Sequence, residues 1–309
     1  MKDRPEADAL DLQFPPPLSN ARIEFPPGYP IRIQSSSAEW SLFLKDYYEA
    51  FQAEGSIPPE TTYSIAPAWP RFRGFSLRSN GARLCVRRQI QRALGILDER
   101  IMDEVCKTSN PYFLIHAAMV TCGGRGVLLG GSLRSGKSTL TLGLILRGWQ
   151  YLSDNITAIC PDPLMAVPFP RNFIVRTETR EVLAVDLQEN GDASWVRPLK
   201  PLSAYVSPNR IWEGSLGRPA KVTHIVFLQY HPEASSAVVP MSRADAVSRL
   251  ARRAWGTDVF GRQAVDILAD LVEGAECVEL AAGPLDENCR LIERLCGVSG
   301  KLNRAEERT

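Results

Sequence analysis

The sequence predicts an α/β protein in which a nucleotide-binding core follows a smaller α+β domain. The first observation is a phosphate-binding loop pattern matched without a mismatch, Gly131-Ser132-Leu133-Arg134-Ser135-Gly136-Lys137-Ser138. The second is its context, because the apolar run 126–130 leads into the loop and residues 139–147 follow with helical periodicity. The third is the series of apolar strand patterns and amphipathic helix patterns that continues to Cys296. Together they predict a strand, a phosphate loop and a helix inside a larger α/β core.

The loop pattern has a strict physical basis. A loop that wraps phosphate directs several backbone N–H groups inward, and Gly131 and Gly136 provide the tight points without a Cβ atom. Lys137 is expected to place its charge on the β- and γ-phosphates, and Ser138 to hold Mg²⁺ through its hydroxyl. We therefore expect a nucleoside triphosphate or diphosphate and Mg²⁺ as ligands; a glycine-rich turn without a ligand is the alternative. The residues expected to bind the nucleotide here are Gly131, Ser132, Leu133, Arg134, Ser135, Gly136, Lys137, Ser138 and Thr139.

Composition excludes several classes of protein. The chain has 309 residues, is 44% hydrophobic and carries a net charge of +1, so no global field attracts it to nucleic acid or to an anionic membrane. Its seven cysteines form no C-x-x-C pair, which argues against a disulfide framework and a zinc site and favours a reducing cytoplasm. No apolar stretch reaches membrane-spanning length. We expect a cytoplasmic protein without a nucleic-acid or membrane partner.

Four segments are expected along the chain. Residues 1–30 contain Pro15-Pro16-Pro17 and Pro26-Pro27, which predict an extended tail or arm. Residues 31–111 are expected to form the α+β domain, with a break at Asn110-Pro111. Residues 112–297 form the nucleotide-binding domain, and residues 298–309 a C-terminal tail.

Periodicity assigns the elements of both domains. In the first domain we expect a helix around residues 40–47, strands at 74–77 and 83–87, and a helix at 90–106. In the second domain, the expected strands lie at 112–121, 126–130, 150–160, 222–230 and 278–281, the third of them interrupted at 153–155. The expected helices of the second domain lie at 139–147, 243–254, 258–273 and 285–296.

Three further residues are candidates for the chemistry. Asp154 follows an apolar strand beyond the loop helix, where a carboxylate either activates a hydroxyl or holds Mg²⁺; a local turn is its alternative. His116 lies on an apolar strand, where a packed core histidine is the common outcome. Arg171 follows a rigid Pro-Phe-Pro and is expected either to reach a phosphate or to form a surface ion pair.

These residues carry a resemblance to a known family. The segments His116-Ala117-Ala118, the loop 131–138 and Arg147-Gly148-Trp149-Gln150-Tyr151-Leu152-Ser153-Asp154-Asn155 resemble the catalytic domain of the HPr kinase/phosphorylase family, in letters and in spacing. Pro168-Phe169-Pro170-Arg171 is similar to a motif of HPr-kinase-like proteins and of their phosphoenolpyruvate carboxykinase cousins. The resemblance covers roughly residues 112–296.

The resemblance implies a kinase with its phosphate loop on a mixed β-sheet flanked by helices, which transfers a phosphoryl group from ATP to a serine hydroxyl. The acceptor in that family is a carrier protein, free serine or the terminal serine of a peptide. Carried over by position, Asp154 is the base, Lys137 binds the phosphates, His116 lies close to them, and Ser138 with Asn155 holds Mg²⁺.

Two departures limit the transfer. The family usually has two adjacent acids where this chain has Asp154-Asn155, and a neutral amide offers Mg²⁺ an oxygen without a charge. The Arg-Gly-x-Gly segment of authentic HPr kinases is absent, so neither HPr as a substrate nor a phosphorylase activity is expected. We expect a kinase acting on the hydroxyl of a peptide, protein or small molecule; a nucleotide-binding interaction protein and an ATPase are the alternatives. A homo-oligomer stays open.

Overall fold

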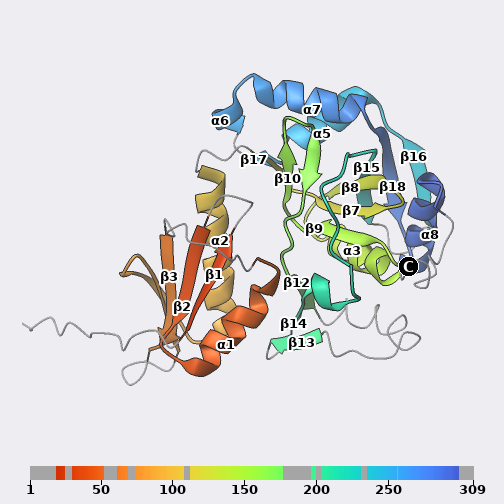
Figure 1. The fold of residues 1–309 in the computed structure, drawn as a ribbon. Helices are drawn as coiled ribbons and strands as arrows, with labels where there is room; N and C mark the ends of the chain where they lie inside the picture. Colours follow the sequence, from red (N-terminus) through yellow and green to blue (C-terminus); the bar gives the residue numbers. More distant parts are fainter. Residues whose placement is uncertain are drawn as a thin grey trace, which may run out of the picture.

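The computed structural model describes residues 19–24, 30–51, 61–68, 74–107, 112–176, 196–199, 203–230, 235–255 and 257–298. The predicted C-terminal tail beyond residue 298, most of the predicted N-terminal arm and the break at Asn110-Pro111 lie outside the described residues. The described part is a mixed α/β structure with several sheets flanked by helices, as the sequence predicts (Figure 1).

The N-terminal unit is a sheet with strand order β1-β2-β3-β4-β5 and two helices (Figure 1). Its elements are β1 (Ser19–Glu24), β2 (Pro30–Ser35), α1 (Ala38–Tyr47), a 3₁₀ turn (Glu49–Phe51), β3 (Thr61–Pro67), β4 (Phe75–Ser79), β5 (Ala82–Arg87) and α2 (Ile90–Lys107). The predicted helices and the strands β4 and β5 are present. Strand β1 extends this sheet into the segment expected to be an arm, because it pairs antiparallel with β2 over its whole length.

The core of the molecule is a sheet with strand order β16-β18-β15-β8-β7-β9. Its strands are β7 (Ala118–Cys122), β8 (Arg125–Gly131), β9 (Gln150–Ser153), β15 (His224–Tyr230), β16 (Ala237–Pro240) and β18 (Glu276–Ala282). Strand β15 runs parallel to both β8 and β18. Strand β7 lies between β8 and β9 and is antiparallel to both, so β9 runs in the same direction as β8. The carboxyl ends of β18, β15, β8 and β9 therefore meet at one edge.

Helices cover both faces of this sheet (Figure 1). They are α3 (Lys137–Leu146) and α8 (Leu285–Leu295) on one face, and α5 (Arg243–Ala251) and α7 (Gln263–Glu273) on the other. Alternate residues of each central strand face opposite layers, so that Leu128 of β8 packs with α5 and α7 while Val127 and Leu129 pack with α3 and α8. Strand β8, which leads into the predicted phosphate loop, is thus buried on both faces, as continuous apolar runs predict.

Two smaller sheets complete the second domain. One has the order β11-β10-β6-β17 and the other β12-β14-β13. Their strands are β6 (Phe113–Ile115), β10 (Thr157–Cys160), β11 (Met165–Val167), β12 (Phe173–Arg176), β13 (Val196–Leu199), β14 (Ser203–Val206) and β17 (Ala254–Trp255). A 3₁₀ turn (Pro208–Arg210) follows β14.

Three predicted elements are divided in the structure. The strand expected at 112–121 becomes β6 and β7, and the strand expected at 150–160 becomes β9 and β10, each pair belonging to two different sheets. The helix expected at 258–273 becomes α6 (Thr257–Phe260) and α7, because Gly261 adopts a left-handed φ of 54° between them. Across the described residues, no helix combines the length and apolar character needed to cross a bilayer.

Candidate functional site

The predicted phosphate loop joins the carboxyl end of β8 to the first turn of α3. Two of its residues have left-handed backbones, Arg134 with φ 64° and Gly136 with φ 91°, and these turn the chain tightly between strand and helix. A Cβ atom on Gly131 would lie 2.3 Å from Ser135 Oγ and 3.1 Å from the Leu228 carbonyl oxygen. Both glycines of the motif therefore serve the backbone path for which the sequence predicts them.

Lys137 folds back over the loop. Its Nζ donates hydrogen bonds to the carbonyl oxygens of Gly131 at 3.0 Å and Ser132 at 2.9 Å. An ammonium has three donors, so one more is available to an anion in the loop. Burial lowers the pKa of Lys137, Asp154 raises it and Arg253 lowers it. A buried positive charge thus lies directly against the predicted phosphate loop.

Ser135 supplies a direct test of whether the loop fits a phosphate. Its side chain is buried, and among the described residues its Oγ has no hydrogen-bond partner. A buried hydroxyl without a partner is destabilising by about 1–3 kcal/mol, and such groups in native structures commonly point to a ligand or an ion. Together with the first turn of α3, whose N–H groups lack intrahelical partners, the loop fits an anionic group.

Asp154 lies at the carboxyl end of β9, beside the same helix. It is 2% exposed, and the Ser138 hydroxyl lies 3.0 Å from Oδ1 and 2.9 Å from Oδ2. Burial raises the pKa of this carboxyl, while the Ser138 hydrogen bond and the charges of Arg171 and Lys137 oppose that rise. The structure thus places the Ser138 hydroxyl, a predicted Mg²⁺ ligand, in hydrogen-bond contact with Asp154, the predicted base.

The two divided strands bring His116 and Asn155 to the same place. β6 pairs with β10 and β7 pairs with β9, so the crossings at His116 and at Asn155 lie side by side between the two sheets. Asn155 has a left-handed φ of 67°, a conformation that asparagine tolerates better than most residues, and its Nδ2 donates to Asp154 Oδ2 at 3.2 Å. Burial, Lys137 and Arg253 lower the pKa of His116, and a hydrogen bond with the Asn155 side chain partly offsets them.

Arg253 and Trp255 also belong to this site, and the sequence did not indicate them. Helix α5 ends at Ala251 rather than at the expected Ala254, which frees a short strand to pair with β6. The Arg253 carbonyl accepts a hydrogen bond from His116 N at 2.7 Å, and its Nε lies 3.3 Å from the Gly131 carbonyl oxygen. The Trp255 ring stacks on the His116 ring at 5.5 Å between centroids. In the sequence, only the pair of adjacent arginines 252 and 253 could have pointed to this part of the site.

Arg171 lies deeper than the sequence suggested. Its guanidinium lies 3.5 Å from the Asp98 carboxylate of α2, which also accepts hydrogen bonds from the hydroxyls of Tyr47 at 3.1 Å and Tyr48 at 2.7 Å. Burial lowers the pKa of Arg171, but Asp98 and the neighbouring tyrosines outweigh it and leave that pKa raised. Its charge still lowers the pKa of Asp154. The structure thus places it between the N-terminal unit and the candidate base.

The donors around the loop suit a magnesium ion that arrives with a nucleotide. In the part of the chain that the structure describes, no three His, Cys, Asp or Glu side chains gather into a metal site. The available oxygens are the Asp154 carboxylate, the Ser138 hydroxyl and the Asn155 amide. Mg²⁺ is commonly held by one or two carboxylates together with substrate phosphates, so this set fits it.

Comparisons with known proteins give a sparse result. No protein-family model matches the chain, and no curated protein matches it. Among solved structures, the HPr(Ser) kinase/phosphatase from Coxiella burnetii is similar over 59% of this chain and 87% of its own, at 14% sequence identity and a TM-score of 0.32. A similarity of this size is no argument for function, which has to come from the geometry of the site.

Proposed function

We propose that this protein is an ATP- and Mg²⁺-dependent kinase that phosphorylates a hydroxyl group, with serine as the preferred acceptor. One observation carries the proposal: a buried carboxylate, Asp154, is hydrogen-bonded to the hydroxyl that follows the loop lysine. Phosphoryl transfer needs a phosphate cradle, charge neutralisation and a base near the terminal phosphate. The loop, Lys137 and Asp154 supply these three at one edge of the sheet.

Each residue then has a chemical task. The loop N–H groups, the first turn of α3 and Lys137 hold the phosphates and neutralise the charge that spreads over the transferred group. Bound Mg²⁺ would add charge neutralisation, and Ser138, Asn155 and Asp154 are the residues that would hold it. Asp154 accepts the proton of the attacking hydroxyl as the new oxygen–phosphorus bond forms and the bond to the nucleoside diphosphate breaks. Its raised pKa makes it a stronger base than an ordinary carboxylate.

His116 acts as a neutral group in this scheme. Its lowered pKa keeps the imidazole uncharged at neutral pH, so it contributes hydrogen bonding and not a positive charge. The stacked Trp255 and the hydrogen bond of His116 with Asn155 fix the ring beside the phosphate end of the loop. Arg171 serves through its charge on Asp154, since Asp98 engages its guanidinium.

Substituting Lys137→Ala tests the nucleotide site. A ligand that binds only the folded protein at a hundred times its dissociation constant stabilises it by ~2.7 kcal/mol. We expect Mg·ATP to raise the melting temperature of the parent and to leave that of the variant unchanged in a thermal-shift assay. The matched control is Lys221→Ala, an exposed lysine outside the loop. An equal shift for parent and K137A would contradict the proposed site.

Chemistry is tested separately from binding. Purified protein with Mg·[γ-³²P]ATP is incubated with free L-serine and with a short peptide that ends in serine. We expect label in one of these acceptors, and a rate of labelling lower by about 10²- to 10⁴-fold with Asp154→Asn. Release of inorganic phosphate without a labelled acceptor would support an ATPase instead.

A nucleotide-binding interaction protein is the second candidate, and Asn155 is the observation that favours it. The neutral amide donates to Asp154 and so occupies an oxygen that a metal would otherwise use. Aspartate also tolerates the left-handed backbone at this position. If the site is a kinase, Asn155→Asp should tighten Mg²⁺ dependence about ten-fold, measured as the Mg²⁺ concentration at half-maximal turnover. If both the parent and Asn155→Asp show no turnover, the result would favour the nucleotide-binding interaction protein.

A further inference from the structure

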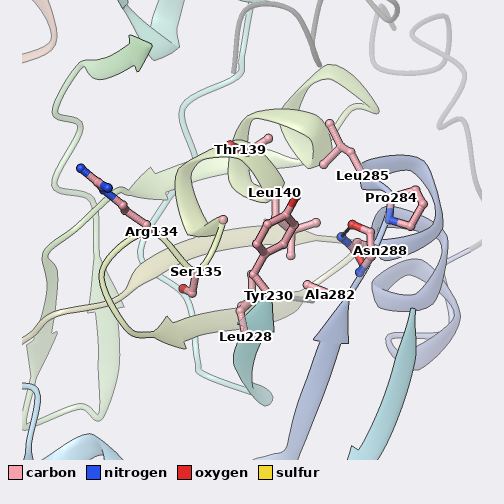
Figure 2. Close-up of a pocket in the computed structure, with 12 residues that line it drawn as sticks. Arg134, Ser135, Thr139, Leu140, Leu228, Tyr230, Ala282, Pro284, Leu285 and Asn288 are labelled. Carbon is pink, nitrogen blue, oxygen red and sulfur yellow. Dashed lines mark hydrogen bonds between the residues drawn. The ribbon is translucent and has the colours of Figure 1, made fainter. Parts of the chain in front are cut away.

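A cavity opens on the side of the phosphate loop opposite Asp154. It has a volume of about 460 Å³ and lies between the start of α3, the carboxyl ends of β15 and β18 and the start of α8 (Figure 2). Ser135 and Thr139 line it from the loop side, and Tyr230 and Leu285 line it from the far side. Arg134, Ser135 and Gly136 of the predicted phosphate loop are among the lining residues, so the cavity adjoins that loop.

The walls are built from apolar and aromatic surface on a fixed loop. The Asn288 side chain is buried, and its amide donates to the Gly283 carbonyl oxygen at 2.9 Å and accepts from Gly283 N at 3.2 Å. The amide is therefore engaged in holding the loop before α8. Pro284 follows in that loop, and its ring restricts its own φ, which is −56°. The Tyr230 ring, 54% exposed, lines the cavity (Figure 2).

The strand order indicates how a nucleotide bound in the loop would be oriented between Asp154 and the cavity. β15 and β18 lie on one side of β8, and β9, which carries Asp154 at its end, lies on the other. On the helix itself, Ser138 is bonded to Asp154 while Thr139 lines the cavity. Phosphates in the loop that present their terminal group to Asp154 have their other end at the cavity.

We propose that this cavity binds the nucleoside part of the donor nucleotide, with the base packed on the Tyr230 ring against Pro284 and Leu285. The inference rests on the proposed nucleotide site and adds the place and mode of nucleoside recognition. Because ring and aliphatic surface dominate the wall and the Asn288 amide is engaged by Gly283, the base is held by its face rather than read at its edge. The donor base is therefore poorly discriminated.

Isothermal titration calorimetry with three probes tests this. The probes are Mg·ATP, Mg·GTP and inorganic tripolyphosphate, the last of which has phosphates and no nucleoside. We expect ATP and GTP to bind the parent within about five-fold of each other. Tyr230→Ala should weaken both by about ten-fold, the usual effect of losing one base-stacking ring, and leave tripolyphosphate affinity unchanged. Tyr230→Phe keeps the ring and should retain ATP affinity.

The outcomes separate this inference from the proposed function. If ATP binds in a Lys137-dependent way and Tyr230→Ala has no effect, or weakens tripolyphosphate equally, the nucleoside site is overturned and the phosphate site stands. If the parent binds neither ATP nor tripolyphosphate, both proposals fail. Tyr230→Trp gives a second readout: ATP, and not tripolyphosphate, should quench the added fluorescence. Val239→Ala, an exposed side chain of β16 outside the cavity, is the matched surface control.

Discussion

At the scale of single residues, Asp154, the proposed base, is a carboxylate held in a buried position. The carboxylate is buried, its pKa is raised chiefly by that burial, and two neighbouring charges and the Ser138 hydroxyl only partly compensate. Between the ordinary carboxyl pKa and the raised one, the folded protein binds more protons than the unfolded chain. Stability contributed by this group is therefore present at low pH and lost as pH rises through that window.

Removing the charge should separate stability from activity. We expect Asp154→Asn to raise the free energy of unfolding at pH 7 by on the order of 1 kcal/mol, because the amide needs no counter-charge when buried. Turnover should fall by about 10²- to 10⁴-fold, the contribution of a general base. Denaturant unfolding and the labelled-serine assay measure the two effects.

Asp270→Asn is the control, since this aspartate is exposed on α7 and should change neither property beyond about 0.5 kcal/mol. A variant D154N that is less stable than the parent at pH 7 would show that the hydrogen bonds of the carboxylate outweigh its desolvation.

At the scale of elements, the phosphate loop depends on a close approach of backbone to side chain. A Cβ on Gly131 would press on Ser135 Oγ and on the Leu228 carbonyl oxygen of the neighbouring strand. The second of these atoms is backbone in a central parallel pair and yields little.

We expect Gly131→Ala to destabilise the fold by about 1–3 kcal/mol and to remove ATP binding, because overpacking displaces the loop. Chemical denaturation and calorimetry check the two results. Gly95→Ala is the matched control: it lies in α2, nothing lies within 4 Å of a Cβ placed there, and the helix should gain about 0.5–1 kcal/mol. Equal effects of the two substitutions would contradict the steric argument.

The divided strands show where local patterns stop being informative. The runs 112–121 and 150–160 are largely apolar, so periodicity predicts one strand in each, the second interrupted at 153–155. In the structure each run leaves one sheet and enters another at the residues that form the site, His116 and Asn155. The change from one sheet to the other is decided by pairing with strands distant in the sequence. A local apolar pattern does not specify those partner strands.

At the scale of the whole molecule, the N-terminal unit shares one apolar cluster with residues between 112 and 206. Residues of α1, α2 and β3 pack with Leu114, Ile156 and Phe169 of the second domain. Hydrogen bonds also cross the boundary, from Asn172 Nδ2 to the Tyr47 carbonyl oxygen and from the Tyr205 hydroxyl to Asp46. The first domain thus supports the segment that carries Arg171.

This support predicts a long-range effect on the candidate base. With Asp98→Asn, the Arg171 charge is no longer balanced by the carboxylate and acts more strongly on Asp154. We expect the acid limb of the pH–turnover profile to move to lower pH, together with a loss of stability of about 1–3 kcal/mol. The pH dependence of turnover separates this effect from simple destabilisation.

Asp46→Asn is the matched control, because Asp46 pairs with Arg210 at the same boundary. It should lower stability and leave the pH profile in place. A profile that moves equally in both variants would show that loosening the boundary, and not the charge of Arg171, governs the base.

The sequence by itself determined the strand, loop and helix at 125–146 and most of the other helices, because glycine placement and helical periodicity are local constraints on the backbone. It also named Asp154 and His116. Only the tertiary structure decided that Asp154 meets Ser138, that Arg253 and Trp255 join His116, and that Arg171 is held by Asp98. The physical reason is that these contacts follow from strand pairing and from packing between distant segments, which no short window of sequence contains.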